Sequence, residues 1–273
     1  MENLAAVKTH EEEVRSGERF EFGDNWTNFL RLLDDERISD AVDSLKTMLE
    51  VDSLQGMTFL DVGSGSGLFS LAARRLGARV HSFDYDPKSV ACTRELRARY
   101  FPNDSAWEVQ AGSVLDESYL ASLGTFDIVY SWGVLHHTGN MWQALDNVER
   151  NVKPGGKLFI ALYNHQPFVS RYWTMVKKAY NRYPLTRPLF TLVHGIYPTL
   201  PSVLLRMLKS GKYPRGMNAW YDLRDWLGGY PFEVSRPEEV FTFYKARGYG
   251  LSTIRTVGGK MGCNEFVFQR HAG

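Results

Sequence analysis

The 273-residue chain has little cysteine and no long apolar run. Its two cysteines, Cys92 and Cys263, lie far apart without the spacing of a metal site or a disulfide framework, which favours a reducing compartment. No stretch approaches the ~20 apolar residues that a membrane-spanning helix needs. The acidic N-terminus lacks the basic-then-apolar pattern of a signal peptide. We therefore expect a cytoplasmic globular protein.

One part of the chain lacks acidic residues altogether. Residues 150–221 contain 12 Lys or Arg and no Asp or Glu, whereas residues 1–60 contain 14 acidic and 6 basic side chains. A basic surplus of this size could bind an anionic small molecule, a nucleic acid or an anionic membrane surface. It could equally pack against the acidic N-terminal part. The sequence leaves these alternatives open.

Apolar runs and helix-like segments alternate between residues 57 and 164. This alternation predicts a parallel sheet with helices on both faces and right-handed crossovers. The expected strands are 57–62, 79–84, 106–112, 126–132 and 157–164, with helices at 66–76, 88–100 and 141–152 and a turn at 153–156. A further helix is expected at 36–50 and another at 237–247, and strands at 249–257 and 263–271 predict a β-hairpin.

Three alternating glycines, Gly63, Gly65 and Gly67, follow the first predicted strand. Dinucleotide-binding folds use G-x-G-x-x-G, in which a pyrophosphate lies on a helix N-terminus. Here the third glycine comes one residue earlier, and Asp61 would repel a pyrophosphate but suit an ammonium group. Asp84, at the end of the second strand, can accept hydrogen bonds from ribose hydroxyls. A ribose, no phosphate and a cationic tail together describe S-adenosylmethionine.

Five successive segments resemble the motifs of class I S-adenosylmethionine-dependent methyltransferases, over about residues 57–164. They are FLDVGSGSG, FDYD, AGSVLDE, FDIVYSWGVLHHT and VKPGGKLFIALYN. The chain is most similar in character to the polyprenyl-hydroxyphenyl (ubiquinone-type) methylases and related small-molecule enzymes. The resemblance implies an α/β, Rossmann-like, doubly wound seven-stranded sheet with a C-terminal β-hairpin, and a mainly helical insertion between strands five and six.

Four parts are expected along the chain. Residues 1–56 would form an N-terminal helical cap, and residues 57–164 the cofactor-binding core. Residues 165–236 would form a helical and aromatic insertion that acts as a lid or substrate wall, or as scaffold alone. Residues 237–273 would complete the core. Within the insertion, residues 188–215 could pack as helices or lie at a membrane surface.

The resemblance also assigns cofactor contacts by position. The three glycines would pass against the methionine part, Asp61 would hold the loop and the amino end, and Asp84 would clamp the ribose. Further contacts are expected from Tyr85, Ser113, Val114, Trp132, Gly133 and Val134. Two of these have plainer alternatives, because Asp61 could only cap the turn and Tyr85 could face solvent.

No metal is expected. Some quinone methylases carry an E-x-x-E-H pattern after the fourth strand, and it binds a divalent cation. The equivalent GVLHH has Gly133 and His136 in place of the two carboxylates, so the hard oxygen ligands are missing.

Histidines supply the candidate general base, which is needed if the acceptor is a hydroxyl or a protonated amine. His136 and His137 follow the fourth strand and His165 the fifth, at the edge where ligands bind to parallel sheets. We expect one of the three to be the base; alternatively, His136 and His137 only begin a helix.

Substrate contacts are expected from Phe22, Trp26, Tyr163, Asn164, Trp220, Tyr221, Arg224, Trp226 and Tyr230.

The predicted function is transfer of a methyl group from S-adenosylmethionine to a small-molecule acceptor, at a hydroxyl oxygen of a specialised metabolite, sugar or phenol. The acceptor could be anionic. Alternatives are a membrane-associated quinone precursor, an amine nitrogen, a non-catalytic binding module and a nicotinamide-dependent oxidoreductase, which the glycine spacing and Asp61 oppose. Nucleic-acid methylation is disfavoured because the N/D-P-P-Y/F tetrad is absent. Peripheral membrane contact and oligomerisation stay open.

Overall fold

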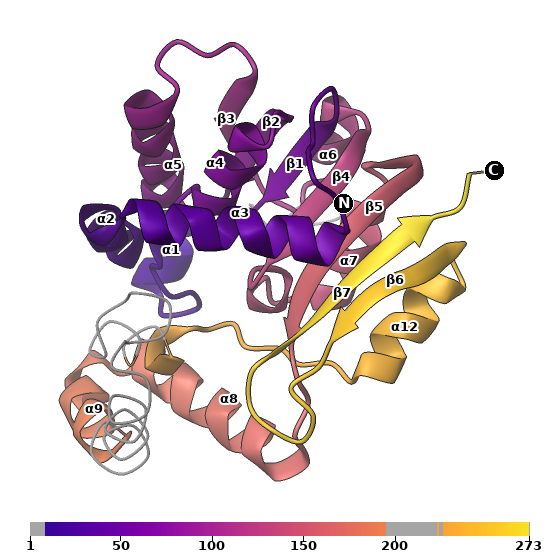
Figure 1. Cartoon of the computed structure of the whole chain (residues 1–273). Helices are drawn as coiled ribbons and strands as arrows, with labels where there is room; N and C mark the ends of the chain where they lie inside the picture. Colours follow the sequence, from indigo (N-terminus) through magenta and orange to yellow (C-terminus); the bar gives the residue numbers. More distant parts are fainter. Residues whose placement is uncertain (1–8, 195–222, 224–225, 273) are drawn as a thin grey trace, which may run out of the picture.

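A seven-stranded sheet forms the centre of the protein, whose computed structural model describes residues 9–194, 223 and 226–272 (Figure 1). The strands are β1 (Thr58–Val62), β2 (Arg79–Asp84), β3 (Trp107–Ala111), β4 (Phe126–Trp132), β5 (Val152–Tyr163), β6 (Tyr249–Arg255) and β7 (Cys263–Arg270). Their order is β3-β2-β1-β4-β5-β7-β6. β1 to β5 run parallel, and β7 pairs antiparallel with both β5 and β6. The predicted doubly wound sheet with its terminal hairpin is confirmed.

The order of the strands indicates where in the sheet a ligand crevice lies. The chain passes from β1 outward to β3, then returns to the other side of β1 and continues through β4 and β5. In such sheets ligands bind at the carboxyl ends of the strands where the order reverses, here between β1 and β4.

Helices cover both faces of the sheet (Figure 1). The described helices are α1 (His10–Arg15), α2 (Gly23–Leu32), α3 (Asp35–Leu49), α4 (Leu68–Arg75), α5 (Pro87–Tyr100), α6 (Glu117–Leu123), α7 (Met141–Glu149), α8 (Pro167–Arg182), α9 (Arg187–His194) and α12 (Pro237–Lys245), with 3₁₀ turns η1 (Leu135–His137) and η2 (Pro184–Thr186). Because successive strand residues face opposite sides, Phe59 packs with α3, α4 and α5, and Leu60 packs with α6, α7 and α12.

Several predicted boundaries were wrong, and for two of them the structure shows the physical reason. The helix expected from residue 66 begins at Leu68, because Gly67 precedes it as a left-handed N-cap with φ 81°. The turn expected at residues 153–156 lies inside β5, which begins at Val152. Val152 pairs with Phe126 of β4 and Lys157 with Ile128, so the register shifts across residues 153–156, which form a bulge within the strand.

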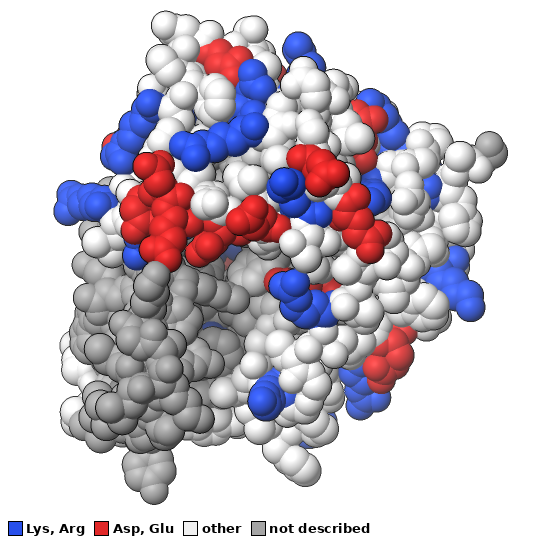
Figure 2. Space-filling model, viewed as in Figure 1, with Lys and Arg blue, Asp and Glu red and all other residues white. Residues whose placement is uncertain are grey.

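α1, α2 and the insertion lie near the carboxyl edge of the sheet, whereas α3 crosses one of its faces. α2 packs on α5 and α3 on α4, while α8 and α9 lie beyond the end of β5 (Figure 1). Figure 2 shows acidic side chains gathered over the N-terminal helices, whose first turns carry several of them. The described contact between this region and the basic insertion includes a hydrogen bond from Arg182 Nη1 to the carbonyl of Ser16 (3.1 Å). None of the described helices is both long and apolar enough to span a bilayer.

Candidate functional site

The glycine loop is a tight turn between β1 and α4. Gly63, Gly65 and Gly67 have φ of 79°, 55° and 81°, which side chains rarely adopt. The N–H of Gly63 donates to the carbonyl of Phe83 (2.9 Å), so the loop is fastened to the end of β2. A Cβ added at Gly63 would lie 2.4 Å from Cγ1 of Val134. The loop therefore needs glycine here for its backbone and for the close approach of the turn after β4.

Asp84 lies where β2 ends, beside the glycine loop. Its Oδ2 accepts the N–H of Gly65 and its Oδ1 accepts the N–H of Asp86, both at 2.9 Å. Desolvation raises the pKa of Asp84 to about 6. Each oxygen of an ionised carboxylate can accept more than one hydrogen bond, so the group fits a vicinal diol. Its contact with ribose stays a prediction.

Asp61 is only 2% exposed and faces α4. Its Oδ2 accepts a hydrogen bond from Ser70 Oγ at 2.5 Å, and Ser70 in turn contacts Ser82 Oγ at 2.7 Å. Burial, with a smaller contribution from the charge of Asp84, raises the pKa of Asp61 to about 7. The carboxyl thus joins β1 to α4 through Ser70. Its predicted contact with the amino end of the cofactor stays a prediction.

Tyr85 follows Asp84 and contacts the N-terminal segment. The ring of His10 meets it edge-on at 5.3 Å, and the guanidinium of Arg19 lies 5.1 Å from its centroid. Tyr85 is thus half-buried between these side chains.

Ser113 and Val114 follow β3. Ser113 Oγ accepts a hydrogen bond from the N–H of Leu115, and the carbonyl of the buried Val114 accepts one from the amide of Asn147.

The turn after β4 combines a glycine with two apolar residues. Trp132 donates its indole N–H to Glu265 Oε1 of β7 (2.8 Å), which directs the indole across the sheet edge. Gly133 has φ 76°, and Val134 packs on Gly63 as described above. The structure therefore brings Val134 to the glycine loop, while the indole N–H of Trp132 donates to β7.

The predicted aromatic residues of the N-terminal part reach the same edge. A Cβ added at Gly65 would lie 3.1 Å from Trp26 Nε1, so the indole lies directly against the loop. The ring of Phe22 is 5.1 Å from that of His137. The N–H of Gly23 donates to Asp86 Oδ2 at 2.7 Å, which fastens the start of α2 beside the second strand.

His136 and His137 occupy η1 but differ in hydrogen bonding. His137 Nδ1 lies 2.6 Å from the carbonyl of Pro231, which can only accept, so Nδ1 carries the proton. The N–H of Tyr163 donates to His136 Nδ1 at 3.3 Å, so the proton of that neutral ring is on Nε2. His136 Nε2 is buried and has no hydrogen-bond partner among the described residues. Only His137 can present an unprotonated Nε2.

Burial sets the charge of both rings. His136 is 0% exposed and His137 is 9% exposed. Desolvation lowers the pKa of His136 well below its usual range and that of His137 to about 3; the nearby charge of Lys177 acts in the same direction. Both imidazoles are therefore neutral near pH 7. His165 is partly exposed, and its backbone N–H donates to the carbonyl of Ser235.

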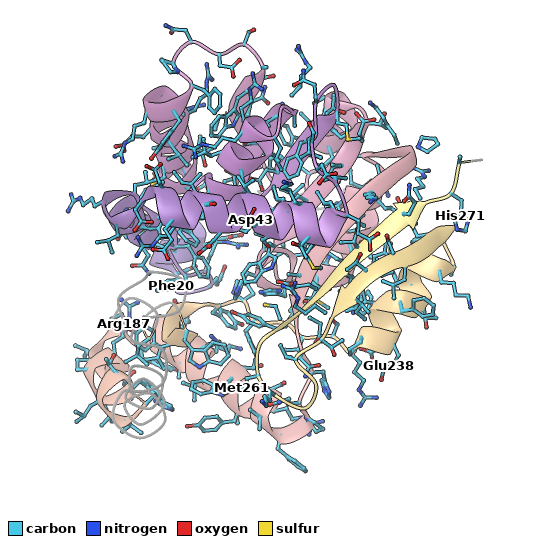
Figure 3. All side chains as sticks on the ribbon, viewed as in Figure 1. Phe20, Asp43, Arg187, Glu238, Met261 and His271 are labelled. Carbon is cyan, nitrogen blue, oxygen red and sulfur yellow. The ribbon has the colours of Figure 1, made fainter. Side chains whose placement is uncertain are left out.

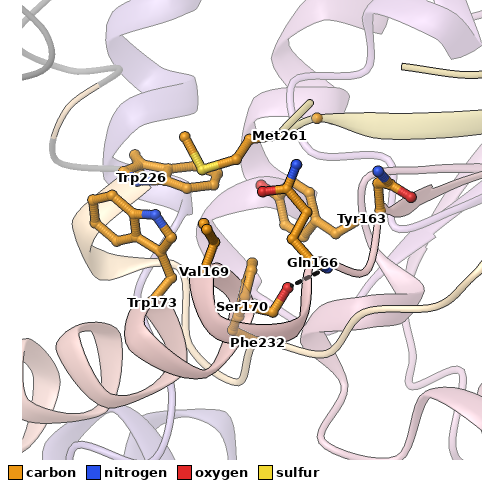
Figure 4. Close-up of a pocket in the computed structure, with 10 residues that line it drawn as sticks. Tyr163, Gln166, Val169, Ser170, Trp173, Trp226, Phe232 and Met261 are labelled. Atoms are coloured by element: carbon orange, nitrogen blue, oxygen red, sulfur yellow. Dashed lines mark hydrogen bonds between the residues drawn. The ribbon is translucent and has the colours of Figure 1, made fainter. Parts of the chain in front are cut away.

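A small pocket lies at the end of β5, between α8 and the β6–β7 loop (Figure 4). Trp173 and Trp226 face it with ring centroids 5.1 Å apart, and Met261 lies beside the ring of Trp226 in Figure 4. Tyr163 joins this pocket to the histidine turn, because its ring is 4.0 Å from His136 and 5.8 Å from Trp226. The pocket is thus a continuation of the candidate site.

The other predicted substrate residues differ in what the structure shows. The amide of Asn164 donates to the carbonyls of Gly258 and Lys260, so it holds the β6–β7 loop. Tyr230 accepts the N–H of Phe20 through its carbonyl. Trp220, Tyr221 and Arg224 lie outside the described residues.

Sequence patterns gave no indication of Arg19 and Pro231. Both touch η1 from distant parts of the chain. Arg19 Nη1 donates to the carbonyl of His137 at 2.9 Å, and the carbonyl of Pro231 accepts a hydrogen bond from the His137 ring. Neither belongs to a local motif that could have revealed the contact. Within the described ranges, no three His, Cys, Asp or Glu side chains converge as metal ligands would.

Comparison with known proteins identifies the domain. The family described as "Methyltransferase domain" matches residues 60–160. The ubiquinone biosynthesis O-methyltransferase of Xanthomonas oryzae pv. oryzae is 33% identical over 114 residues, which cover 42% of this chain and 46% of that protein. Residues 60–160 of this chain are thus similar to a methyltransferase domain. The cofactor and the activity of the whole chain stay predictions.

The likeness to the methyltransferases has clear limits. The corresponding enzyme of Rhizobium etli is 31% identical over 111 residues, 41% of this chain and 43% of that protein. The chain thus matches less than half the length of these curated relatives. Magnesium protoporphyrin IX methyltransferase from Synechocystis PCC 6803 has a TM-score of 0.54 at 15% identity, covering 92% of this chain and 97% of that chain. The [4+2]-cyclase SpnF also reaches 0.54, at 13% identity over 85% and 80%. Both likenesses show the fold alone.

Proposed function

We propose that the protein methylates a hydroxyl oxygen of a small-molecule acceptor, with His137 as the general base. Bound S-adenosylmethionine supplies an electrophilic methyl group on a sulfonium. The observation that supports the base is the hydrogen bond from His137 Nδ1 to Pro231, because it leaves the Nε2 lone pair free to take the hydroxyl proton. The ring follows β4, at the edge where the strand order reverses.

The other two histidines are less suited to this role. The Nε2 of His136 carries a proton and its Nδ1 already accepts from Tyr163, so neither nitrogen can take another. His165 follows β5 and has no described side-chain hydrogen bond that would fix its ring. Burial lowers the pKa of His137 to about 3, so the ring is neutral near pH 7 but a weak base, which takes the proton only once the oxygen has begun to bond to the methyl carbon. As the hydroxyl oxygen attacks the methyl carbon, its proton passes to His137 Nε2.

The remaining residues would bind and align the reactants. Asp84 would accept hydrogen bonds from the ribose hydroxyls beside the glycine loop. Trp26, whose indole lies against Gly65, would cover the loop. The aromatic side chains at the end of β5, among them Trp173 and Trp226, support an acceptor with an apolar part, which would have to displace them because the cavity they line has a volume of about 10 Å³. Alignment of the reacting atoms can lower the barrier by roughly 7–11 kcal/mol.

A membrane-associated acceptor is the second candidate, and the exposed face of the insertion favours it. Phe168 and Leu185 are 84% and 97% exposed. Further exposed apolar side chains on α8 and α9 are Tyr172, Met175, Leu189, Leu192 and Val193. Residues 167–194 contain five Lys or Arg and no acidic residue, the composition of segments that bind anionic lipid surfaces. Flotation with anionic and with neutral vesicles tests this candidate; failure to float with anionic vesicles removes it.

An acceptor screen tests the leading proposal. The chain would be incubated with S-adenosylmethionine and a panel of phenols, sugars, quinone precursors and amines, with S-adenosylhomocysteine release and product mass as readouts. We expect methylated products from hydroxylated ring compounds. Products methylated only on nitrogen would overturn the choice of acceptor atom, and turnover that persists in His137→Ala would overturn the base.

A further inference from the structure

Arg19 lies in the connection between α1 and α2 and contacts both halves of the site. Its Nη1 and Nη2 donate to the carbonyls of His137 (2.9 Å) and Thr138 (3.5 Å). Its guanidinium also lies 5.1 Å from the centroid of Tyr85, the residue after Asp84. One side chain thus joins the end of β2 to the turn after β4.

The guanidinium is itself held in place. Arg19 Nε donates to Glu13 Oε2 at 2.5 Å, and the two side chains are 16% and 24% exposed. The planar guanidinium of a partly buried Arg–Glu pair moves less than the end of an exposed lysine or arginine side chain does. Arg19 therefore connects Glu13 of α1 to the carbonyl of His137, so the position of α1 helps to fix the position of the histidine turn.

The connection around Arg19 also docks on the insertion. The N–H of Phe20 donates to the carbonyl of Tyr230 at 2.9 Å, one residue before Pro231. A Cβ added at Gly228 would lie 2.1 Å from the Phe20 ring, so the ring packs directly on that glycine. Figure 3 shows Phe20 where the N-terminal helices meet the insertion. The segment 16–22 thus lies between the cofactor side, the histidine turn and the insertion.

We propose that Arg19 is a positioning residue for methyl transfer: it holds the N-terminal segment across the cofactor edge and fixes the histidine turn relative to Tyr85. This inference rests on the proposed function, because it takes the β2 end as the nucleoside side and η1 as the base side. Arg19 acts through its neighbours and supplies no group to the reaction. Cofactor binding, which orders the Tyr85 side, then also stabilises the position of His137.

Binding of S-adenosylhomocysteine, measured by calorimetry, is the primary test because it needs no acceptor. Arg19→Met keeps the length of the side chain and removes its charge and donors. We expect it to weaken binding, by at most roughly 30-fold, the limit reached if the whole cation–π contact forms only with cofactor bound. Arg15→Met, on the exposed arginine of α1, is the matched control and should stay within about twofold.

A double-mutant cycle with Tyr85→Leu shows whether Arg19 acts through that ring. If it does, Arg19→Met adds little to the loss of affinity already caused by Tyr85→Leu. Arg19→Lys keeps the charge but not the two-carbonyl contact, so it should give an intermediate affinity. Should Arg19→Met fail to fold, Arg19→Lys with and without Tyr85→Leu replaces it in the cycle.

Turnover provides a readout that a merely structural role would not move. The charges that face His137 are Arg19 from the N-terminal segment and Lys177 from α8, with neutral His136 in the same turn. Since Arg19 helps to lower the pKa of His137, Arg19→Met should move the acidic limb of the kcat–pH profile to higher pH as well as lower kcat. Arg15→Met should leave the profile unchanged.

The outcomes separate the two proposals. A wild-type chain that ignores S-adenosylhomocysteine overturns the proposed function and, with it, the role of Arg19. A wild-type chain that binds, with Arg19→Met binding equally well and keeping its pH profile, overturns the role of Arg19 alone. Additive losses in the cycle would show that Arg19 does not act through Tyr85, which also overturns the inference.

Discussion

The imidazole of His137 donates from Nδ1 to the carbonyl oxygen of Pro231, 94 positions later in the chain, at 2.6 Å. A residue after β4 thus has its tautomer set by the returning end of the insertion. Glu233 strengthens this junction, because its N–H donates to the carbonyl of His136 and its carboxylate accepts the N–H of Met141. The insertion therefore fixes the tautomer of the proposed base, and its residues also line the pocket.

Replacement of His137 separates chemistry from binding. We expect His137→Ala to lower kcat for a hydroxyl acceptor by roughly 10²- to 10⁴-fold, the usual contribution of a general base. Affinity for S-adenosylhomocysteine should change little, since the ring lies on the acceptor side. His165→Ala is the control and should keep most of the turnover. The reverse pattern, a silent His137→Ala and an inactive His165→Ala, would move the base to the end of β5.

Replacement of Asp84 should weaken cofactor binding. Asp84→Asn removes the charge and puts an NH₂ group opposite the N–H of Gly65 or of Asp86, so one hydrogen bond becomes a repulsive contact. We expect affinity for S-adenosylhomocysteine to fall roughly 10- to 100-fold, as hydrogen bonds to charged groups imply. Asp43→Asn, on the exposed face of α3, should bind as the wild type does. Equal affinity in both variants would show that the carboxylate does not hold the nucleoside.

Asp61 makes the stability of the cofactor-free protein depend on pH. Its pKa is raised from 3.8 to about 7, so between pH 4 and 7 the unfolded chain has lost a proton that the folded chain keeps. The free energy of unfolding therefore falls as pH rises through this window and levels off above it. About three pKa units correspond to a loss of at most about 4 kcal/mol.

Asp61→Asn tests this pH dependence, because the amide can still accept from Ser70 and does not titrate. Urea unfolding at pH 4.5, 6 and 8 should show a steeper fall in the free energy of unfolding for the wild type than for Asp61→Asn. Parallel curves for the two proteins would mean that Asp61 is ionised in the folded state across the whole range.

Local pattern predicted the core well and long-range contacts poorly. β2 and β4 have the predicted bounds, 79–84 and 126–132, because buried parallel strands read as short apolar runs between turns. The position of the glycine loop was predicted equally well, because few residues other than glycine adopt its backbone conformation. By contrast, Arg19 reaches the carbonyl of His137 across 118 positions, and nothing in either sequence neighbourhood specifies that partner.

Polar residues were the hardest to assign. Asn164, for which substrate contact stays a prediction, also holds the β6–β7 loop, because its amide donates to the carbonyls of Gly258 and Lys260. Position at the end of a strand places a side chain near the site but does not say which hydrogen bonds it makes. Those bonds depend on loops that fold back from elsewhere, and their partners carry no shared sequence pattern.

Gly63 offers a test of the close approach between the loop and the turn after β4. Gly63→Ala forces a side chain onto φ 79° and places its Cβ 2.4 Å from Val134, whereas Gly155→Ala meets similar backbone strain at φ 74° with no atom within 4 Å. We expect Gly155→Ala to cost roughly 1–2 kcal/mol of unfolding free energy from the backbone alone. Gly63→Ala should cost a further 1–3 kcal/mol or so from overpacking, measured by urea unfolding.

The double variant Gly63→Ala/Val134→Ala identifies the source of that extra cost. If the Val134 side chain causes it, removing two of its methyl groups should restore part of the lost stability, and should do so only in the Gly63→Ala background. Equal losses in Gly63→Ala and Gly155→Ala would instead mean that the turn after β4 moves away at little cost. In that case the position of η1, and of His137 within it, would not depend on the glycine loop.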